Sequence, residues 1–190
     1  MQNHEWSHRV YAIDLSPTAQ LRPLEPWQAE EFLAHIDRAR PNVDPYIPWC
    51  TFSPDLESAR KTLQKYANFQ AADTGRIAGI WLEGTLVGGV MLFGMDAASG
   101  HAEAGCWLEE AGQGHGLITA AMRVLLDWAF DTRGLHRIVW ECWDRNERSQ
   151  ATAQRLGFTH EGTLREEFLY RGERRNTMVF SLLTTERKKD

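Results

Sequence analysis

Stretches in which apolar residues alternate with polar ones, or run unbroken between turn residues, predict seven β-strands. Most of them are followed by short polar turns that contain glycine, so neighbouring strands are expected to run mostly antiparallel. The predicted strands cover residues 19–24, 77–82, 86–93, 101–108, 137–143, 158–170 and 177–183.

Apolar residues spaced three and four apart predict four helices among these strands. The first opens at Glu25-Pro26-Trp27, with proline in its first turn, and ends at Pro41. The second begins with Ser53 as its N-cap, followed by a proline. The third covers residues 119–130 and the fourth residues 147–156. The expected fold class is α+β, with a mostly antiparallel central sheet of about seven strands between flanking helices.

Length and composition fit one domain with its own core. The chain has 190 residues, of which 43% are hydrophobic and 25% are charged, as in ordinary globular proteins. Residues 1–18 show no strong period and are interpreted as an N-terminal arm. Residues 19–185 form the predicted domain, and residues 186–190 a solvated tail.

The charge balance narrows the choice of partner. A net charge of −5 gives no support for a nucleic-acid binder and weakly suits a cationic one. No apolar run approaches the length of a membrane span, and the first residues lack the profile of a secretory signal. We therefore expect a cytoplasmic protein that binds neither nucleic acid nor membrane.

Three cysteines, Cys50, Cys106 and Cys142, are widely spaced and form no metal-binding pattern. We interpret them as reduced, buried thiols and expect no metal site. A catalytic cysteine stays an alternative, although none has an obvious partner nearby in the sequence.

The segment Gln113-Gly114-His115-Gly116-Leu117-Ile118-Thr119 joins a predicted strand to a predicted helix. Glycines let backbone N–H groups approach an anion, and the following helix adds unpaired N–H groups and the positive end of its dipole. The segment therefore indicates a loop that binds phosphate or pyrophosphate, with a plain strand-to-helix turn as the alternative.

Two other segments allow two interpretations each. The proline-rich loop from Asn42 to Trp49 carries two aromatic residues, which could wall a ligand site or seal the core. Gly88-Gly89 interrupts a predicted strand and marks either a bulge or a close backbone approach.

The order strand, glycine loop, helix, strand, Asn-x-x-Ser, helix, Gly-Phe resembles the GNAT superfamily of acyl-CoA-dependent N-acetyltransferases. The loop matches the superfamily pattern at Gln113 and Gly116, whereas Ile118 stands where the pattern has a small residue. The block Asn146-Glu147-Arg148-Ser149 and the later Leu156–Gly162 look like the branch that acetylates the N-termini of ribosomal proteins. The segments 42–49 and Arg165–Leu169 are similar to that branch as well.

The resemblance implies direct transfer of an acetyl group from acetyl-CoA to a primary amine. The strands 101–108 and 137–143 would splay apart to admit the pantetheine arm, and a backbone N–H near Leu108 would polarise the thioester carbonyl. The implied cofactor-binding residues are Trp107, Leu108, Gln113, Gly114, His115, Gly116, Leu117, Ile118, Thr119, Asn146 and Ser149.

The resemblance also assigns catalytic roles. Glu167 matches the acid that removes a proton from the amine, with Glu166 and Glu103 as alternatives. Ser149 would protonate the departing thiolate, and its alternative is a plain hydroxyl in the first turn of a helix. Tyr46, Trp49 and Glu103 are the expected acceptor-binding residues.

The expected acceptor is the N-terminal α-amine of a protein such as a ribosomal protein. A small amine (polyamine, aminoglycoside or amino-acyl toxin) and a non-catalytic CoA-binding module are the alternatives. Relatives often form dimers, so a homodimer is expected. A Rossmann dinucleotide-binding domain fits less well, because the strands before the loop pair as hairpins and do not alternate with helices.

Overall fold

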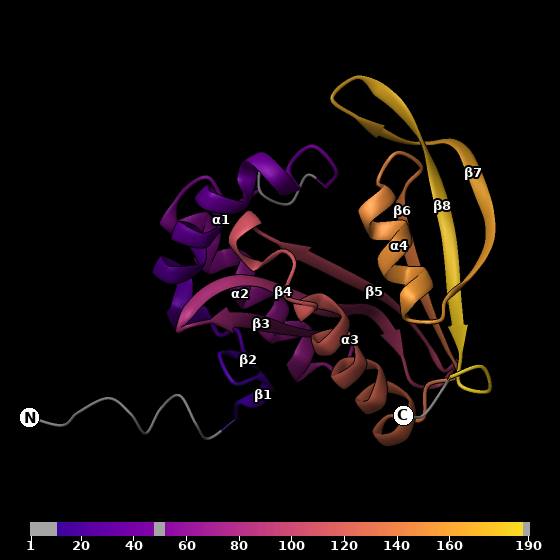
Figure 1. The fold of residues 1–190 in the computed structure, drawn as a ribbon, viewed down its shortest axis with the longest axis horizontal. Helices are drawn as coiled ribbons and strands as arrows, with labels where there is room; N and C mark the ends of the chain where they lie inside the picture. Colours follow the sequence, from indigo (N-terminus) through magenta and orange to yellow (C-terminus); the bar gives the residue numbers. More distant parts are fainter. Residues whose placement is uncertain (1–10, 48–51, 188–190) are drawn as a thin grey trace, which may run out of the picture.

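The computed structural model describes residues 11–47 and 52–187 (Figure 1). The described strands are β1 (Ile13–Ser16), β2 (Ala19–Pro23), β3 (Arg76–Leu82), β4 (Thr85–Asp96), β5 (His101–Leu108), β6 (Arg137–Trp143), β7 (Thr159–Tyr170) and β8 (Glu173–Leu183). The helices are α1 (Ala29–Val43), α2 (Leu56–Ala71), α3 (Leu117–Asp127) and α4 (Glu147–Arg155). Shorter turns are η1 (Pro26–Gln28), η3 (Glu110–Gly112) and the π-helical η4 (Trp128–Thr132).

The described strands form a single sheet in the order β1-β2-β3-β4-β5-β6-β8-β7. All neighbours pair antiparallel except β5 and β6, which are parallel. The mostly antiparallel α+β class is therefore confirmed, with eight strands in place of about seven. The extra strand is β1, which pairs with β2 inside the stretch predicted to be an arm, so that boundary was wrong. Its four residues are too short and too exposed to show a period.

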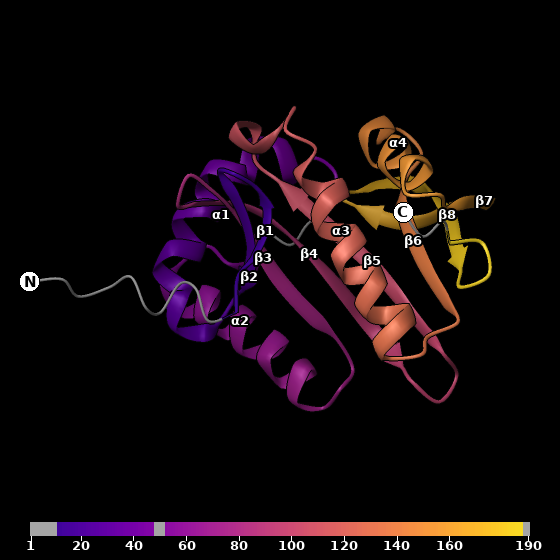
Figure 2. The same cartoon turned by 60° about the horizontal axis from the view of Figure 1, so that its bottom comes forward.

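Helices cover both faces of the sheet (Figures 1 and 2). One core lies between α1, α2 and the sheet and contains Phe32, Ile36, Leu63 and Trp81. The other lies under α3 and α4 and is built around apolar residues such as Met122 and Trp140. Both cores reach the strands β4 and β5, so these strands are held from both sides.

Two predicted helix ends were wrong. The second helix begins at Leu56 because Asp55, not Ser53, is its N-cap: the Asp55 carboxylate accepts a hydrogen bond of 2.8 Å from the Ser58 N–H. Ser53 is instead buried, with its hydroxyl 2.8 Å from that of Thr62. Pro41 does not end the first helix but lies in its last turn, where a missing N–H costs only one hydrogen bond.

Gly88 and Gly89 mark a close approach, one of the two interpretations of this pair. A Cβ atom on Gly89 would lie 2.2 Å from the Trp107 ring, and one on Gly88 would lie 2.5 Å from the Trp107 carbonyl oxygen. The indole of Trp107 therefore lies flat over β4, which needs the missing side chains.

The parallel pair β5 and β6 separates along its length, as the resemblance implied. Their register runs from His101↔Arg137 to Ala104↔Trp140 and then ends, although both strands continue. Beyond that point β5 stays paired with β4, and β6 stays paired with β8. The opening between the strands therefore splits one continuous sheet into two halves.

The two halves meet again at the far end of the cleft, where the β7–β8 hairpin reaches the end of α1 (Figure 1). The Tyr170 hydroxyl donates a hydrogen bond of 2.6 Å to the Asp44 carbonyl, and Arg171 pairs with the Asp44 carboxylate. Arg175 donates a hydrogen bond of 2.9 Å to the Pro45 carbonyl. This bridge closes the cleft at the end opposite the β5–β6 ladder.

Candidate active site

A cavity of ≈ 390 Å³ lies between the splayed strands and the glycine loop. Ten of the eleven predicted cofactor-binding residues line it: Trp107, Leu108, Gln113, Gly114, Gly116, Leu117, Ile118, Thr119, Asn146 and Ser149. The remaining one, His115, is exposed and does not line the cavity. The sequence pattern thus placed the loop, the strand end and the Asn-x-x-Ser block around one space.

The glycine loop has the geometry of an anion site. Gly114 and Gly116 have φ angles of 82° and 69°, in the left-handed region that favours glycine. Gly116 is also the N-cap of α3, so the N–H groups of Leu117, Ile118 and Thr119 lie in the first turn, where no helical carbonyl is available to them. This first turn faces the cavity and carries the positive end of the α3 dipole.

The free edge of β5 supplies further donors. The Glu109 N–H donates a hydrogen bond of 2.8 Å to the Val87 carbonyl, which fixes the side of β5 that faces β4. Because N–H groups alternate sides along a strand, those of Cys106 and Leu108 point away from β4, toward the cleft. The Leu108 N–H therefore faces the cleft, and its role as donor to a thioester stays a prediction, with Cys106 as a second candidate.

Ser149 lies in the first turn of α4, where the Asn146 side chain caps the helix by accepting a hydrogen bond of 3.2 Å from the Ser149 N–H. The Ser149 hydroxyl oxygen accepts a hydrogen bond of 2.9 Å from the indole N–H of Trp140, a buried residue of β6. The Ser149 side chain also hydrogen-bonds the Cys142 side chain, and Ser149 lines the cavity.

A second cavity, of ≈ 590 Å³, lies on the α2 side of the splayed strands. It shares Tyr46, Ile47, Cys106, Asn146 and Ser149 with the first cavity. The two spaces therefore meet at Ser149, so molecules bound in each could react there.

Three carboxylates follow one another from the second cavity to the surface. Glu103 and Glu141 both line the cavity, and the parallel register places them on the same face of β5 and β6. Burial and, second, the Glu141 carboxylate raise the pKa of Glu103 to about 7. Burial and then the Glu167 carboxylate raise the pKa of Glu141. Glu167 is exposed on β7, so this row of three carboxylates ends at solvent.

The predicted acidic residues thus occupy different places. Glu103 lines the second cavity, whereas Glu167 does not, and its carboxylate accepts a hydrogen bond of 2.8 Å from the Thr177 hydroxyl. Glu166 is exposed, with a φ of 53° at an irregularity in the β7–β8 pairing. Tyr46 lines both cavities, and Trp49 lies outside the described residues.

Three further residues of the site, Glu141, Arg148 and Arg155, were not predicted from the sequence. Both arginines line the first cavity: Arg148 donates a hydrogen bond of 3.0 Å to the Gln113 side chain, and Arg155 lies 3.5 Å from the Thr119 hydroxyl. Their spacing of seven places them on one face of a short helix, a signal that could have found them. Two guanidinium groups beside the glycine loop suit the phosphates of an extended anion.

The two described cysteines are free thiols, as the sequence predicted; Cys142 is buried and Cys106 is half-buried. Burial raises the pKa of Cys106 to about 12 and that of Cys142 to about 11. Both thiols therefore stay protonated near neutral pH. A protonated thiol is a poor nucleophile, because the thiolate is the reactive form. A catalytic role for either one is disfavoured, and Cys50 lies outside the described residues.

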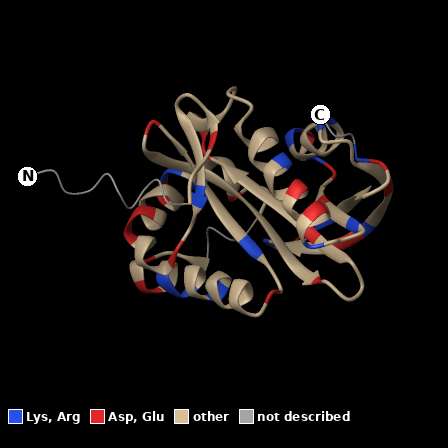
Figure 3. Ribbon diagram, turned by 90° about the horizontal axis from the view of Figure 1, so that it is seen from below, with Lys and Arg blue, Asp and Glu red and all other residues tan. Residues whose placement is uncertain are grey.

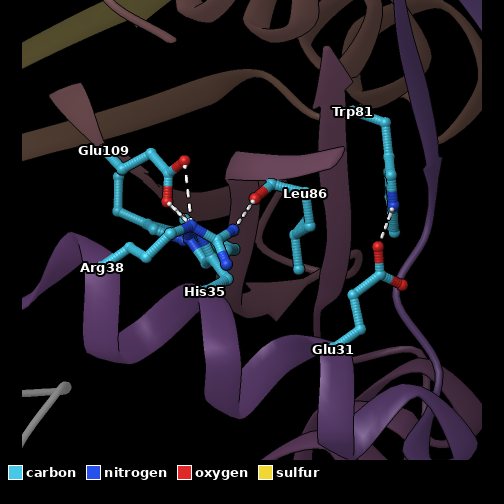
Figure 4. Close-up of polar contacts among 7 residues, drawn as sticks. Glu31, His35, Arg38, Trp81, Leu86 and Glu109 are labelled. Atoms are coloured by element: carbon cyan, nitrogen blue, oxygen red, sulfur yellow. Dashed lines mark hydrogen bonds and ion pairs between the residues drawn. The ribbon is translucent and has the colours of Figure 1, made fainter. Parts of the chain in front are cut away.

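A buried polar network holds the end of β5 (Figure 4). The Glu109 carboxylate accepts hydrogen bonds from His35 and Arg38 of α1, each at 3.0 Å, and Arg38 also donates to the Leu86 carbonyl. The Trp107 indole N–H donates to the other ring nitrogen of His35 at 2.9 Å. Burial lowers the pKa of His35 to about 4, so the ring is neutral, and its Nδ1 carries the proton. The network fixes Trp107 and Glu109 on either side of Leu108.

The distribution of charge and apolar surface agrees with the modest net charge. Basic and acidic segments are interspersed over the ribbon in the view of Figure 3. Among the described residues, no helix combines the length and apolar character needed to cross a membrane. Within the same residues, no group of three or more His, Cys, Asp or Glu side chains is placed to hold a metal ion.

Comparison with known proteins agrees with this geometry. The family model described as "Acetyltransferase (GNAT) domain" matches residues 19–159. A Bacillus subtilis (strain 168) protein named "Putative ribosomal N-acetyltransferase YdaF" is 30% identical over 93% of this chain and 97% of its own length. The ribosomal-protein-serine acetyltransferase of Escherichia coli (strain K12) is 32% identical over 65% of this chain and 69% of its own length.

Among solved structures, the microcin C7 self-immunity acetyltransferase MccE, in complex with acetyl-CoA and AMP, superposes with a TM-score of 0.85. It is 25% identical, over 92% of this chain and 97% of that chain. The family match covers most of the chain, and it includes the glycine loop, the splayed strands and Ser149. The chain belongs to the GNAT family of acetyltransferases, and it is an acyltransferase.

Proposed function

We propose that this protein transfers an acetyl group from acetyl-CoA to the N-terminal α-amine of a protein, such as a ribosomal protein, in the cytoplasm. The observation that carries the proposal is that two cavities, one behind the glycine loop and one on the α2 side, meet at Ser149. Relatives named for ribosomal-protein acetylation support the choice of acceptor.

Acetyl-CoA fits the first cavity as a substrate. The N–H groups at the start of α3 would hold its pyrophosphate, and Arg148 and Arg155 would pair with its phosphates. The N–H groups of Cys106 and Leu108 would donate hydrogen bonds to the pantetheine and thioester oxygens at the β5 edge. The thioester supplies the activated acetyl group, and these contacts aim it at the second cavity.

The acceptor amine must lose a proton to become a nucleophile. An α-amino group has a pKa of about 8, so a base near neutral pKa can remove that proton at little cost. We propose Glu103 as the base in preference to Glu167 or Glu166, because Glu103 lines the second cavity and has a pKa of about 7. Glu141 and then Glu167 would pass the proton to solvent.

Ser149 would protonate the departing thiolate. Its hydroxyl oxygen already accepts the Trp140 N–H, which makes the hydroxyl a better donor, and its proton would turn from the Cys142 side chain to the thiolate. Neither described cysteine takes part, so the amine would attack the thioester directly.

Mass spectrometry tests the proposal directly. Protein N-termini are compared between cells with and without the intact gene, and in parallel the purified protein is assayed for thiol release from acetyl-CoA with N-terminal peptides. The proposal expects an acetylated N-terminus that disappears with the gene and reappears in vitro. Unchanged N-termini, combined with acetylation of a small amine, would favour the second candidate function.

We also propose a homodimer. Strand β7 is the outer edge of the sheet and exposes Leu164, Phe168 and Leu169, which are 47%, 39% and 56% accessible. An apolar edge strand is a surface that proteins normally cover. Light scattering on the purified protein should show twice the monomer mass, and Leu169→Glu should shift it toward the monomer.

A further inference from the structure

The acceptor cavity is lined by carboxylates and by apolar side chains. Glu103 of β5 and Glu141 of β6 supply the carboxylates, on the same face of the two strands. Met91 of β4, which pairs with Gly105 next to this position, and Tyr66 and Phe69 of α2 supply an apolar wall. The Tyr66 and Phe69 rings meet edge to face at 5.9 Å, and the Tyr66 hydroxyl is 3.5 Å from the Met91 sulfur. The polar tip of the tyrosine is therefore turned toward a thioether.

A positive side chain lies beside the apolar wall of the cavity. Lys65 also lines the cavity, and its ammonium lies 5.5 Å from the centre of the Phe69 ring. An acceptor with one ammonium can place it between the two carboxylates and keep its uncharged part among the rings. A polyamine whose second cation extended along this wall would meet Lys65, where like charges repel. The cavity therefore favours a monoamine with an apolar substituent.

The size of the cavity indicates how large that substituent is. A space of ≈ 590 Å³ is within the range of drug-sized ligand sites, which bind by apolar burial and a few polar anchors. Gly105 lets two apolar side chains pack over β5: a Cβ there would lie 3.2 Å from Met91 and 3.3 Å from Phe93. The methyl of alanine or the hydroxymethyl of serine would leave most of this wall without a contact.

We propose that the acceptor is an N-terminal residue with a bulky apolar side chain, such as Met, Leu, Phe or Tyr. Its ammonium lies between Glu103 and Glu141, and its side chain lies against Phe69, Met91 and Phe93. This inference rests on the proposed function, because it names the acceptor of that same reaction. It identifies the acceptor by the wall of the site, independently of the relatives.

The test is a peptide series that differs only at the first residue (Ser, Ala, Met or Phe), together with phenethylamine and spermidine. The readout is kcat/KM for thiol release from acetyl-CoA, with acetylation confirmed by mass. We expect the Met and Phe peptides to exceed the Ser and Ala peptides by about tenfold or more, the size of discrimination that apolar pockets give.

Two variants make the test specific to the site. Phe69→Ala removes one wall on a half-buried helix position and should reduce the ratio of Phe-peptide to Ser-peptide activity several-fold. Ile13→Ala is the control, because it truncates an exposed apolar residue on β1, far along the sheet from β5. It should leave the ratio unchanged.

Each outcome has one meaning. Equal or higher activity with the Ser and Ala peptides overturns this inference but leaves the proposed function intact. A preference for spermidine overturns both the inference and the protein acceptor. Acetylation of phenethylamine without any peptide overturns the protein acceptor and sustains the apolar site. A ratio that Phe69→Ala does not change overturns the assignment of this wall.

Discussion

Replacing Glu103 with glutamine should make the protein more stable and nearly inactive. The carboxyl has a pKa of about 7 in the folded protein, against an ordinary value of 4.5, because burial and then Glu141 disfavour its charged form. Between pH 4.5 and pH 7 the folded state keeps a proton that the unfolded state has released. The free energy of unfolding therefore falls as pH rises through this window, and the loss is complete above about pH 7.

The size of the effect follows from the same two values. A pKa difference of one corresponds to about 1.4 kcal/mol, so the rise from 4.5 to about 7 means that the charged carboxylate costs at most about 3.5 kcal/mol at pH 8. Solvent still reaches part of the group, which reduces the cost to about 2 kcal/mol. Glutamine keeps the shape without the charge. For a chain of this size the gain at pH 8 corresponds to about 4–8 °C in melting temperature.

Thermal melts of wild type and Glu103→Gln at pH 5 and pH 8 test the stability claim. The variant should melt higher at pH 8, with a much smaller difference at pH 5, where the wild-type carboxyl is protonated. Glu30→Gln, at an exposed position in the first turn of α1, is the control and should show little change at either pH. An equal difference at both pH values would refute the reasoning about burial.

The same variant tests the catalytic assignment. Loss of a general base typically costs 10²–10⁴-fold in rate, so kcat should fall by about a hundredfold or more at pH 8. In wild type, kcat/KM should rise with pH up to about 7 as Glu103 ionises. Full activity of Glu103→Gln would return the role to Glu167.

Three further substitutions probe the cofactor side. Ser149→Ala should slow acetyl transfer. It should also lower the free energy of unfolding by about 1–2 kcal/mol, because the buried Trp140 N–H loses its acceptor. A rate defect that is equally large with a thioester of a more acidic thiol would argue against a proton-donor role. Gly116→Val should strain a position with a φ of 69° and raise the Kd for CoA at least tenfold by calorimetry, and normal affinity would undercut the loop assignment. Arg155→Gln should weaken binding of CoA by about tenfold, whereas Lys61→Gln, on the exposed face of α2, should leave it unchanged.

The sequence allowed the cofactor side to be predicted because its information is local. A glycine with positive φ, a helix start and an Asn-x-x-Ser turn each occupy a few consecutive residues, so their geometry follows from the residues themselves. Gly114, Gly116, Asn146 and Ser149 accordingly lie where the pattern placed them.

The acceptor side could not be predicted in the same way, because it depends on contacts between distant strands. Alternation placed Glu141 on one face of its strand, but its proximity to Glu103 follows from the parallel register of β5 and β6. The position of Glu167 depends on the irregular pairing between Leu164 and Phe168, which no local signal marks. A one-residue shift in a strand reverses the face that a side chain occupies.

The cofactor side and the acceptor side of the site must also keep fixed positions relative to each other, and the buried network of α1 contributes to this. The His35 ring accepts from Trp107 with one nitrogen and donates to Glu109 with the other. It therefore fixes the two residues that flank the Leu108 N–H, the expected donor to the thioester. The same helix ends at Val43, just before Asp44 and the bridge to the β7–β8 hairpin.

One rigid helix thus sets the position of the thioester donor and the closed end of the cleft. Burial lowers the pKa of His35 to about 4, so the ring stays neutral and this link stays intact over the pH range in which Glu103 changes charge. We therefore expect the pH dependence of the reaction in this range to come from the carboxylates that line the second cavity and not from loosening of the cofactor site.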